Sequence, residues 1–211
     1  MGCRLLSLSG DYVALDERAG ELIAVAAERG FPVYEALGTI YRGWGKIKTG
    51  DVAEGISLLR SGSSAYGATG QETRMCYYIA LLARACNIAG QIEEALHLLN
   101  NALQAATRIG ERWFMAELYR DKGQLMLRQS DSKAAEQFYR QALTVAKDQE
   151  AKLWELRAAV SLARLWTDQG RRSEAFDVLA PVYKWFIEGV DSHDLRSAKA
   201  LLDELSQNAN A

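Results

Sequence analysis

The sequence has little proline and histidine and only three cysteines, and each shortage excludes a class of protein. Two prolines, Pro32 and Pro181, occur in 211 residues, which favours long helices because proline breaks a helix interior. The only two histidines, His97 and His193, exclude the HExxH zinc motif, because that motif needs two histidines four positions apart. Three widely spaced cysteines do not make a disulfide framework, so we expect a reducing, cytoplasmic compartment.

Long apolar runs and an excess of positive charge are also lacking. No stretch reaches about 18 apolar residues, so no membrane-spanning helix and no membrane partner are expected. Lysine and arginine number 25 against 27 acidic residues, whereas nucleic-acid binding by phosphate neutralisation usually requires a basic surface. We therefore expect no nucleic-acid partner. The 49% hydrophobic and 25% charged residues are typical of a globular protein with a sizeable core.

Motifs of enzymes are lacking as well. No Walker A loop occurs, and no pattern of metal ligands is found. Ser192, His193 and Asp194 are the three residue types of a hydrolase catalytic triad. Because consecutive side chains point in different directions, they cannot act together as nucleophile, base and orienting group. Asp191 or Ser192 is instead expected to cap a helix. The sequence thus predicts no enzyme, no catalytic residue, no metal site and no cofactor.

What the sequence does contain is a 40-residue period marked by glycines. The first series comprises Gly10, Gly50, Gly90 and Gly170, with Ser130 in the remaining slot. The second comprises Gly30, Gly70 and Gly110, followed by Glu150 and by Gly189 one residue early. Each unit therefore carries two breaks, where a tight turn between helices favours a positive φ. Such a period indicates a helical-repeat architecture.

Between the breaks, apolar residues recur at the i, i+3, i+4, i+7 steps of a helix, without the alternation of strands. Asp51 with Glu54, and Thr69 with Glu72, have the spacing of helix capping boxes. The sequence predicts an all-α solenoid of about ten helices paired as antiparallel hairpins, spanning residues 1–206 as one domain. Its units are 1–30 (partial), 31–70, 71–110, 111–150 and 151–190, followed by a capping helix at 191–206 and a tail at 207–211.

The second helix of each unit has a small–large–small register. The register is seen in Gly55, Leu59 and Gly62, in Ala95, Leu99 and Ala102, in Ala135, Tyr139 and Ala142, and in Ala175, Leu179 and Val182. It resembles the tetratricopeptide repeat, whose pattern ends in A-x3-F-x2-A, although the period here is 40 instead of 34. The resemblance implies a right-handed superhelix that acts as a protein-interaction scaffold.

The C-terminal part has a second resemblance. Its strings are WELRAA at 154–159, SLARLW at 161–166 and AKALLDEL at 198–205. They resemble the tetratricopeptide-like array that ends large bacterial regulators, which join an adenylate cyclase-like or DNA-binding head to a signal-transduction ATPase. This resemblance implies a bacterial protein of signal transduction. The repeat length is also similar to that of the superhelical sensor domain of the maltose-regulon activator.

The tetratricopeptide resemblance places the ligand groove on the first helices. The groove positions are Leu37 and Trp44, Tyr77 and Arg84, Arg120 and Gln124, and Arg157 and Arg164. Arginine forks suit a carboxylate, so an acidic peptide or protein segment is one expected partner. The alternative is a solvated helix face, with the arginines paired to Glu117 and Asp121.

Two functions remain open. The first is a non-enzymatic module that binds a protein or peptide segment in its concave groove. The alternative is a regulatory sensor domain of an ATPase- or cyclase-type regulator, with a small-molecule inducer in a deep pocket. At the N-terminal end, where the unit is partial, Leu15, Leu22, Ile23 and Val25 are expected to lack full cover. We therefore expect dimerisation, or a swapped helix, through this end.

Overall fold

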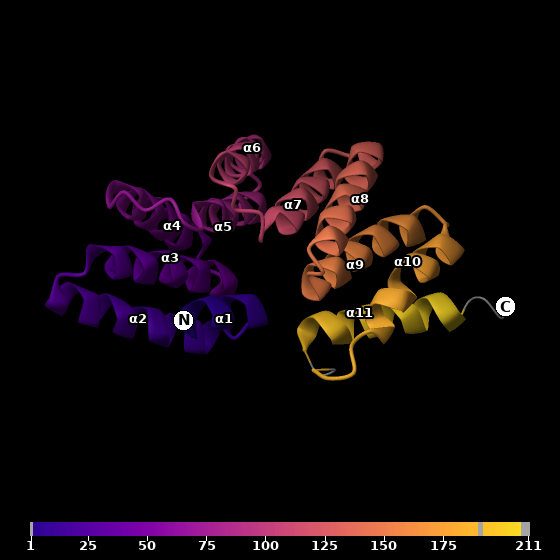
Figure 1. Ribbon diagram of the computed structural model, residues 1–211, viewed down its shortest axis with the longest axis horizontal. Helices are drawn as coiled ribbons and strands as arrows, with labels where there is room; N and C mark the ends of the chain where they lie inside the picture. The colour runs from indigo at the N-terminus through magenta and orange to yellow at the C-terminus, as the bar shows by residue number, and fades with distance from the viewer. Residues whose placement is uncertain (1, 190–191, 208–211) are drawn as a thin grey trace. The chain divides into compact units, whose positions relative to one another are not determined.

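The chain folds into α-helices joined by tight turns (Figure 1). The structure, a computed structural model, describes residues 2–189 and 192–207. Over these ranges it contains eleven helices and no strand, which confirms the all-α fold and adds one helix to the expected number. The helices are α1 (Gly2–Ser9), α2 (Tyr12–Arg29), α3 (Pro32–Thr49), α4 (Val52–Ala68), α5 (Met75–Ile88), α6 (Ile92–Ile109), α7 (Met115–Arg128), α8 (Ser132–Asp148), α9 (Lys152–Asp168), α10 (Arg172–Lys184) and α11 (His193–Gln207).

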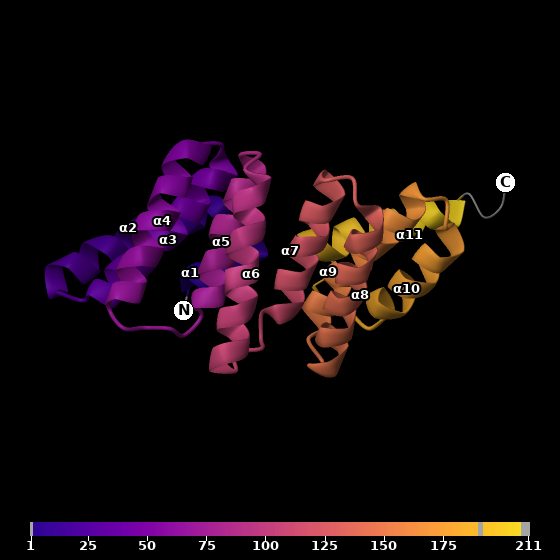
Figure 2. The same cartoon turned by 90° about the horizontal axis from the view of Figure 1, so that it is seen from above.

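The helices form two compact units. The N-terminal unit contains α1 to α6 and ends at Arg112, and the C-terminal unit begins at Trp113 and contains α7 to α11. Within each unit, consecutive helices pack against each other, as α5 packs on α6 and α7 on α8 (Figure 2). Each predicted interval from 1–30 to 151–190 holds two helices. No helix in the described part of the chain is long and apolar enough to cross a membrane.

The breaks between helices have the left-handed backbone that the 40-residue period predicts. Positive φ values occur at Gly10, Gly30, Gly50, Gly70, Gly90, Gly110, Gly170 and Gly189. Ser130 and Glu150, which stand in the same series, adopt φ values of 63° and 52°. Because a Cβ atom disfavours this region, these two positions keep the turn at a cost in conformational energy.

Of the two helix N-caps predicted from the sequence, the structure confirms the one before α4 and contradicts the one before α5. The Asp51 carboxylate accepts the Glu54 N–H at 3.3 Å and caps α4. The capping box predicted at Thr69 and Glu72 is wrong, because the Thr69 hydroxyl donates to the Tyr66 carbonyl and α5 begins only at Met75. A residue far along the chain stabilises the start of α5 instead: the Glu111 carboxylate accepts the Arg74 N–H at 2.7 Å.

Close helix contact is greatest between α3 and α4. All twelve residues of the small–large–small register are buried, and in this hairpin two of them are glycines. A Cβ atom added at Gly55 would lie 2.7 Å from the Gly43 carbonyl oxygen, and one at Gly62 would lie 2.9 Å from the Ile40 amide nitrogen. The two backbones are therefore so close that no side chain fits between them.

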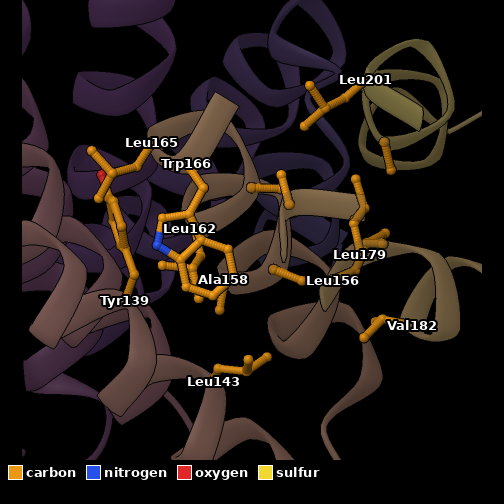
Figure 3. Close-up of a cluster of buried hydrophobic side chains, with 14 of the residues drawn as sticks. Tyr139, Leu143, Leu156, Ala158, Leu162, Leu165, Trp166, Leu179, Val182 and Leu201 are labelled. Carbon is orange, nitrogen blue, oxygen red and sulfur yellow. The ribbon is translucent and has the colours of Figure 1, made fainter. Parts of the chain in front are cut away.

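In the C-terminal unit, larger side chains fill the space between neighbouring helices (Figure 3). Tyr139 and Leu143 of α8 lie on one side of α9, and Leu201 of α11 lies on the other. Leu162 and Trp166 of α9 fill the space between them. This cluster buries side chains from four helices, so each helix is stabilised mainly by packing on its neighbours.

Glycine at the two left-handed positions is expected to stabilise the protein. Ser130→Gly and Glu150→Gly should each raise the free energy of unfolding by about 0.5–1 kcal/mol, because the steric cost of a positive φ is removed. Gln141→Gly, at an exposed position inside α8, is the matched control and should lose about 0.5–1 kcal/mol. Urea denaturation measures all three, and a loss at both turn positions would contradict the assignment.

The α3–α4 contact predicts opposite effects for two glycine-to-alanine changes. Gly55→Ala should destabilise the protein by about 1–3 kcal/mol, because its methyl group overlaps the backbone of α3. Gly20→Ala, inside α2 with no atom within 4 Å of the added Cβ, should stabilise it by about 0.5–1 kcal/mol. Thermal unfolding of both variants tests this, and equal shifts would show that α3 and α4 are not in close contact.

Candidate functional site

Two of the predicted groove residues lie in the core of the N-terminal unit. Tyr77 is fully buried, and its hydroxyl is 2.7 Å from the Ser7 hydroxyl of α1. Trp44 is buried too, with the Lys48 ammonium 5.0 Å from its ring centre. Both rings are therefore covered by neighbouring helices instead of facing a ligand. The sequence pattern did not predict this cover, because α1 belongs to a partial unit.

Leu37, another predicted groove residue, lines a cavity of about 650 Å³ in the N-terminal unit. The cavity is open to solvent, and residues of four helices line it. They are Gly2, Cys3 and Arg4 of α1, Arg18, Glu21, Leu22 and Val25 of α2, Tyr34, Leu37 and Tyr41 of α3, and Tyr78 of α5 with Arg74 just before it. Its volume lies within the range of about 300–1,000 Å³ that is usual for binding sites.

The cavity has apolar walls and a positive rim. Leu22, Val25 and Leu37 form its aliphatic surface. Burial raises the pKa of Tyr78 to about 12 and that of Tyr41 further still, so both phenols stay neutral at pH 7. Three arginines and one glutamate line the cavity, which leaves it with two net positive charges. It suits an apolar group that carries negative charge.

The arginines that line this cavity were not predicted. Arg18 lies 2.7 Å from Glu21 on the exposed side of α2. Arg74 adopts a positive φ of 63° directly before α5, and no helical pattern includes it. The sequence feature nearest to the cavity is the set of poorly covered apolar residues expected in the partial unit 1–30, which includes Leu22 and Val25.

The expectation of poorly covered apolar residues at this end is only partly right. Leu15 is fully buried, because α2 packs on both α1 and α3. Leu22 and Ile23 are half-buried, and Val25 is 51% exposed. Apolar exposure is instead greatest at neighbouring positions, which are Leu5, Val13, Phe31 and Tyr34.

In the C-terminal unit, two predicted groove arginines belong to an internal ion-pair network. Arg120 donates to both oxygens of Glu117 at 2.6 and 3.0 Å and lies 3.4 Å from Asp121. Arg157 of α9 donates twice to Asp194 of α11, at 3.0 and 2.7 Å, and lies 3.5 Å from Glu117. The network joins α7, α9 and α11. Arg120 has the partners that the alternative interpretation named, but the group is buried instead of solvated.

Burial strengthens this network. The Glu117 side chain is 1% exposed, and those of Arg120 and Arg157 are 13% and 16% exposed. Burial by itself lowers the pKa of Arg120, but the charge and hydrogen bonds of Glu117, aided by Asp121, outweigh it and raise this pKa above its usual value. The guanidinium is therefore charged and already has its carboxylate partners.

The eight predicted groove residues are thus divided between the two units. Arg164 is exposed and donates to the Ser197 hydroxyl at 2.7 Å, beside a hollow of about 370 Å³ between α9 and α11. Gln124 and Arg84 are half-buried. In the C-terminal unit, Arg120 and Arg157 are brought together, and Glu117 lies between them.

The residues of the apparent triad have structural roles. The Ser192 hydroxyl accepts the Leu195 N–H at 3.4 Å and caps α11, while the Asp194 carboxylate binds Arg157. Asp191, the other predicted cap, lies outside the described residues. In the part of the chain that the structure describes, no three His, Cys, Asp or Glu side chains gather as metal ligands.

Breaking the buried network is expected to cost far more stability than breaking a surface pair. Glu117→Gln should lower the free energy of unfolding by about 3–5 kcal/mol, because two arginines lose a buried countercharge. Glu21→Gln is the matched control, since the Glu21 side chain is 62% exposed and such pairs contribute about 0–1 kcal/mol. Chemical denaturation compares the two, and a similar small loss in both would show that the network contributes little.

Comparisons with known proteins agree with this architecture. Residues 73–148 match the sequence model described as the tetratricopeptide repeat. An uncharacterized protein of Rhizobium meliloti is 25% identical over 162 residues, which are 76% of this chain and 16% of that protein. The chain therefore spans about a sixth of the length of this relative.

Three solved structures show similar folds at low sequence identity. Rap protein complexed with Competence and Sporulation Factor has a TM-score of 0.74 at 14% identity, over 99% of this chain and 64% of that one. BtubC from P. vanneervenii has a TM-score of 0.69 at 14% identity, over 94% and 90% of the two chains. The tetratricopeptide-like repeats of a putative kinesin light chain from Podosopora anserina have a TM-score of 0.60 at 18% identity, over 85% and 89%. From its hairpins, its register and these matches, the chain has a tetratricopeptide-like helical-repeat fold.

Proposed function

We propose that this protein is a non-enzymatic interaction module that binds a protein or peptide segment in the cavity of its N-terminal unit. The cavity itself is the observation that supports this proposal. Leu22, Val25 and Leu37 offer an apolar surface, and arginines exceed glutamate on its lining. A segment with apolar and acidic side chains would match both properties.

The fold supports an interaction function in a general way. Tetratricopeptide-like repeats generally serve as interaction scaffolds, and the similar Rap protein was solved in complex with a partner. Repeat arrays bind partners on surfaces formed by several helices, and the cavity here is lined by α1, α2, α3 and α5. The unpaired thiols of Cys3, Cys76 and Cys86 fit the cytoplasmic location that we infer for the module.

The cavity also changes which arginines we assign to an acidic partner. Arg120 and Arg157 already bind carboxylates of their own unit, so a ligand at these positions would have to break a buried network. We assign the electrostatic role to Arg18 and Arg74 of the cavity. Of the groove residues predicted from the repeat, Leu37 belongs to this site, while Arg84, Gln124 and Arg164 stay predictions.

The alternative function is a small-molecule sensor within a larger bacterial regulator. Its support is the cavity volume of about 650 Å³, which would hold a drug-sized ligand. The Rhizobium meliloti relative, of which this chain spans 16%, shows that a similar segment occurs within a much longer protein. A compound that raises the melting temperature and blocks peptide binding would favour this alternative.

A homodimer formed through the N-terminal end is a finer proposal. Leu5, Val13 and Phe31 are exposed there, and exposed apolar residues that cluster at one end of a molecule are typical of contact surfaces. The cavity opens on the same end, so a second copy competes with a different partner for this surface. Sedimentation at tens of micromolar protein measures the mass in solution, and a monomeric mass would contradict the homodimer.

A peptide selection on the immobilised protein tests the proposed function. Peptides with apolar and acidic residues should be enriched on the parent protein and lost on Val25→Glu, which removes an apolar side chain from the cavity wall and puts a negative charge there. Val13→Glu is the matched control, because Val13 is 69% exposed on the same helix but does not line the cavity. Enrichment that is equal on all three proteins, or absent from all, would contradict the proposal.

A further inference from the structure

The hollow between α9 and α11 is a second candidate site, in the C-terminal unit. Its volume is about 370 Å³, near the lower end of the range for binding sites, so it suits a small molecule better than a peptide segment. Three residues of α9 and four of α11 line it. Leu201, which reaches from α11 toward α9 in Figure 3, is buried and forms an apolar part of this lining.

The cation of the hollow is Arg164, and its partner is a neutral group. Its Nη2 donates to the Ser197 hydroxyl oxygen at 2.7 Å. Among the described residues it forms no ion pair, although Asp168 stands four positions later on the same helix. Arg164 thus differs from Arg120 and Arg157, which already bind carboxylates. A guanidinium that meets only a hydroxyl keeps its capacity to bind a carboxylate.

The two helices of the hollow run in the same direction. Arg157 of α9 contacts Asp194 of α11, and further along both helices Arg164 contacts Ser197. Residue numbers therefore increase together on the two sides of the hollow. The lining residues that come after Arg164 and Ser197 lie toward the C-terminal ends of both helices.

This C-terminal part of the hollow is negative. Asp168 is the last residue of α9, and Glu204 lies in the last turn of α11. Neither last turn contains a basic residue, and the carbonyl groups at a helix C-terminus add partial negative charge. Within the described ranges the Asp168 carboxylate has no polar partner, and Glu204 is 4.0 Å from Arg172. An ammonium group would find favourable charge here.

The hydroxyl groups of the lining follow the same order. The Ser197 oxygen accepts from Arg164, so its own proton is left to donate to a carboxylate. The Thr167 hydroxyl donates to the Ala163 carbonyl at 2.8 Å, so its oxygen is left to accept from an ammonium. Donors to an anion therefore come first along the hollow, and acceptors from a cation come after them.

We propose that this hollow binds a small zwitterion, with its carboxylate on Arg164 and its ammonium beside Asp168 and Glu204. Positions 164 and 168 are about 6 Å apart along a helix axis. The ligand class that fits is a short ω-amino acid, whose two charges are separated by a chain of methylene groups. Ala200 and Leu201 of the lining would contact that chain. The site goes beyond the peptide site proposed for the N-terminal unit and shares no residue with it.

Ligands with a single charge fit the hollow less well. One arginine and two carboxylates line it, which leaves one net negative charge. A plain carboxylate would bind Arg164 but would be repelled by Asp168 and Glu204, whereas a plain amine would be repelled by Arg164. A zwitterion meets the opposite charge at both of its ends.

Four compounds of similar size test the inference by isothermal titration calorimetry on the full chain. The compound 5-aminopentanoate carries both charges at the required spacing, pentanoate lacks the ammonium, pentylamine lacks the carboxylate, and norvaline holds both charges on one carbon atom. We expect 5-aminopentanoate to bind at least about tenfold more tightly than each of the others. It should also raise the melting temperature, because it binds only the folded protein.

Neutral variants locate the two charges. Arg164→Gln and Asp168→Asn should each weaken binding of 5-aminopentanoate by about tenfold or more, because each removes one countercharge. Lys199→Gln and Asp203→Asn are the matched controls, since both residues are exposed on α11 and do not line the hollow. These two variants should bind as the parent protein does.

Ser197→Ala separates ligand binding from helix packing. It removes the contact between α9 and α11 but leaves both charged ends of the hollow in place, so it should weaken binding less than Arg164→Gln does. An equal loss in the two variants would show that Arg164 acts only by holding α11, and would overturn its role as the carboxylate ligand.

Three results with the compounds would also overturn the inference. Equal binding of pentanoate or pentylamine would show that one charge is sufficient, and equal binding of norvaline would contradict the spacing of the charges. No heat and no change in melting temperature with any of the four would show that the hollow takes no zwitterion. The peptide selection on the N-terminal unit decides the proposed function separately, because Val25 belongs to the other unit.

Discussion

The structure depends on close approach of neighbouring helices at positions that recur every 40 residues. Between α3 and α4 this approach is so close that Gly55 and Gly43 leave no room for a Cβ atom, and in the C-terminal unit Tyr139 fills the equivalent space beside Gly123. Such contacts bury apolar side chains of both helices and so stabilise each hairpin.

The two units use their charged residues differently. In the C-terminal unit, Arg120 and Arg157 are buried with Glu117 and join three helices, so their charges fix the packing of those helices. In the N-terminal unit, Arg18 and Arg74 line an apolar cavity, and the pair that Arg18 forms with Glu21 is exposed. Arginine at a repeat position therefore does not by itself identify a ligand-binding residue, because burial and nearby carboxylates decide its role.

The cavity connects the fold to the proposed interaction. An apolar and acidic segment would bury Leu22 and Val25 there, and its acidic side chains would add orientation and selectivity more than affinity. The cavity is already formed, so little ordering cost arises on the side of this protein.

The sequence by itself determined the helical hairpins, their 40-residue spacing and the buried register, because these depend on local turns and on helical periodicity. Even Ser130 and Glu150 adopt the positive φ that their place in the glycine series predicts. The predicted groove residues were only partly informative. Tyr77 is buried because Ser7, 70 positions away, bonds to it, and Arg157 is paired because α11 brings Asp194 beside it. Only the tertiary structure decided these contacts and the cavity, because both arise where residues far apart in the chain meet, and no periodic pattern records what covers a given face.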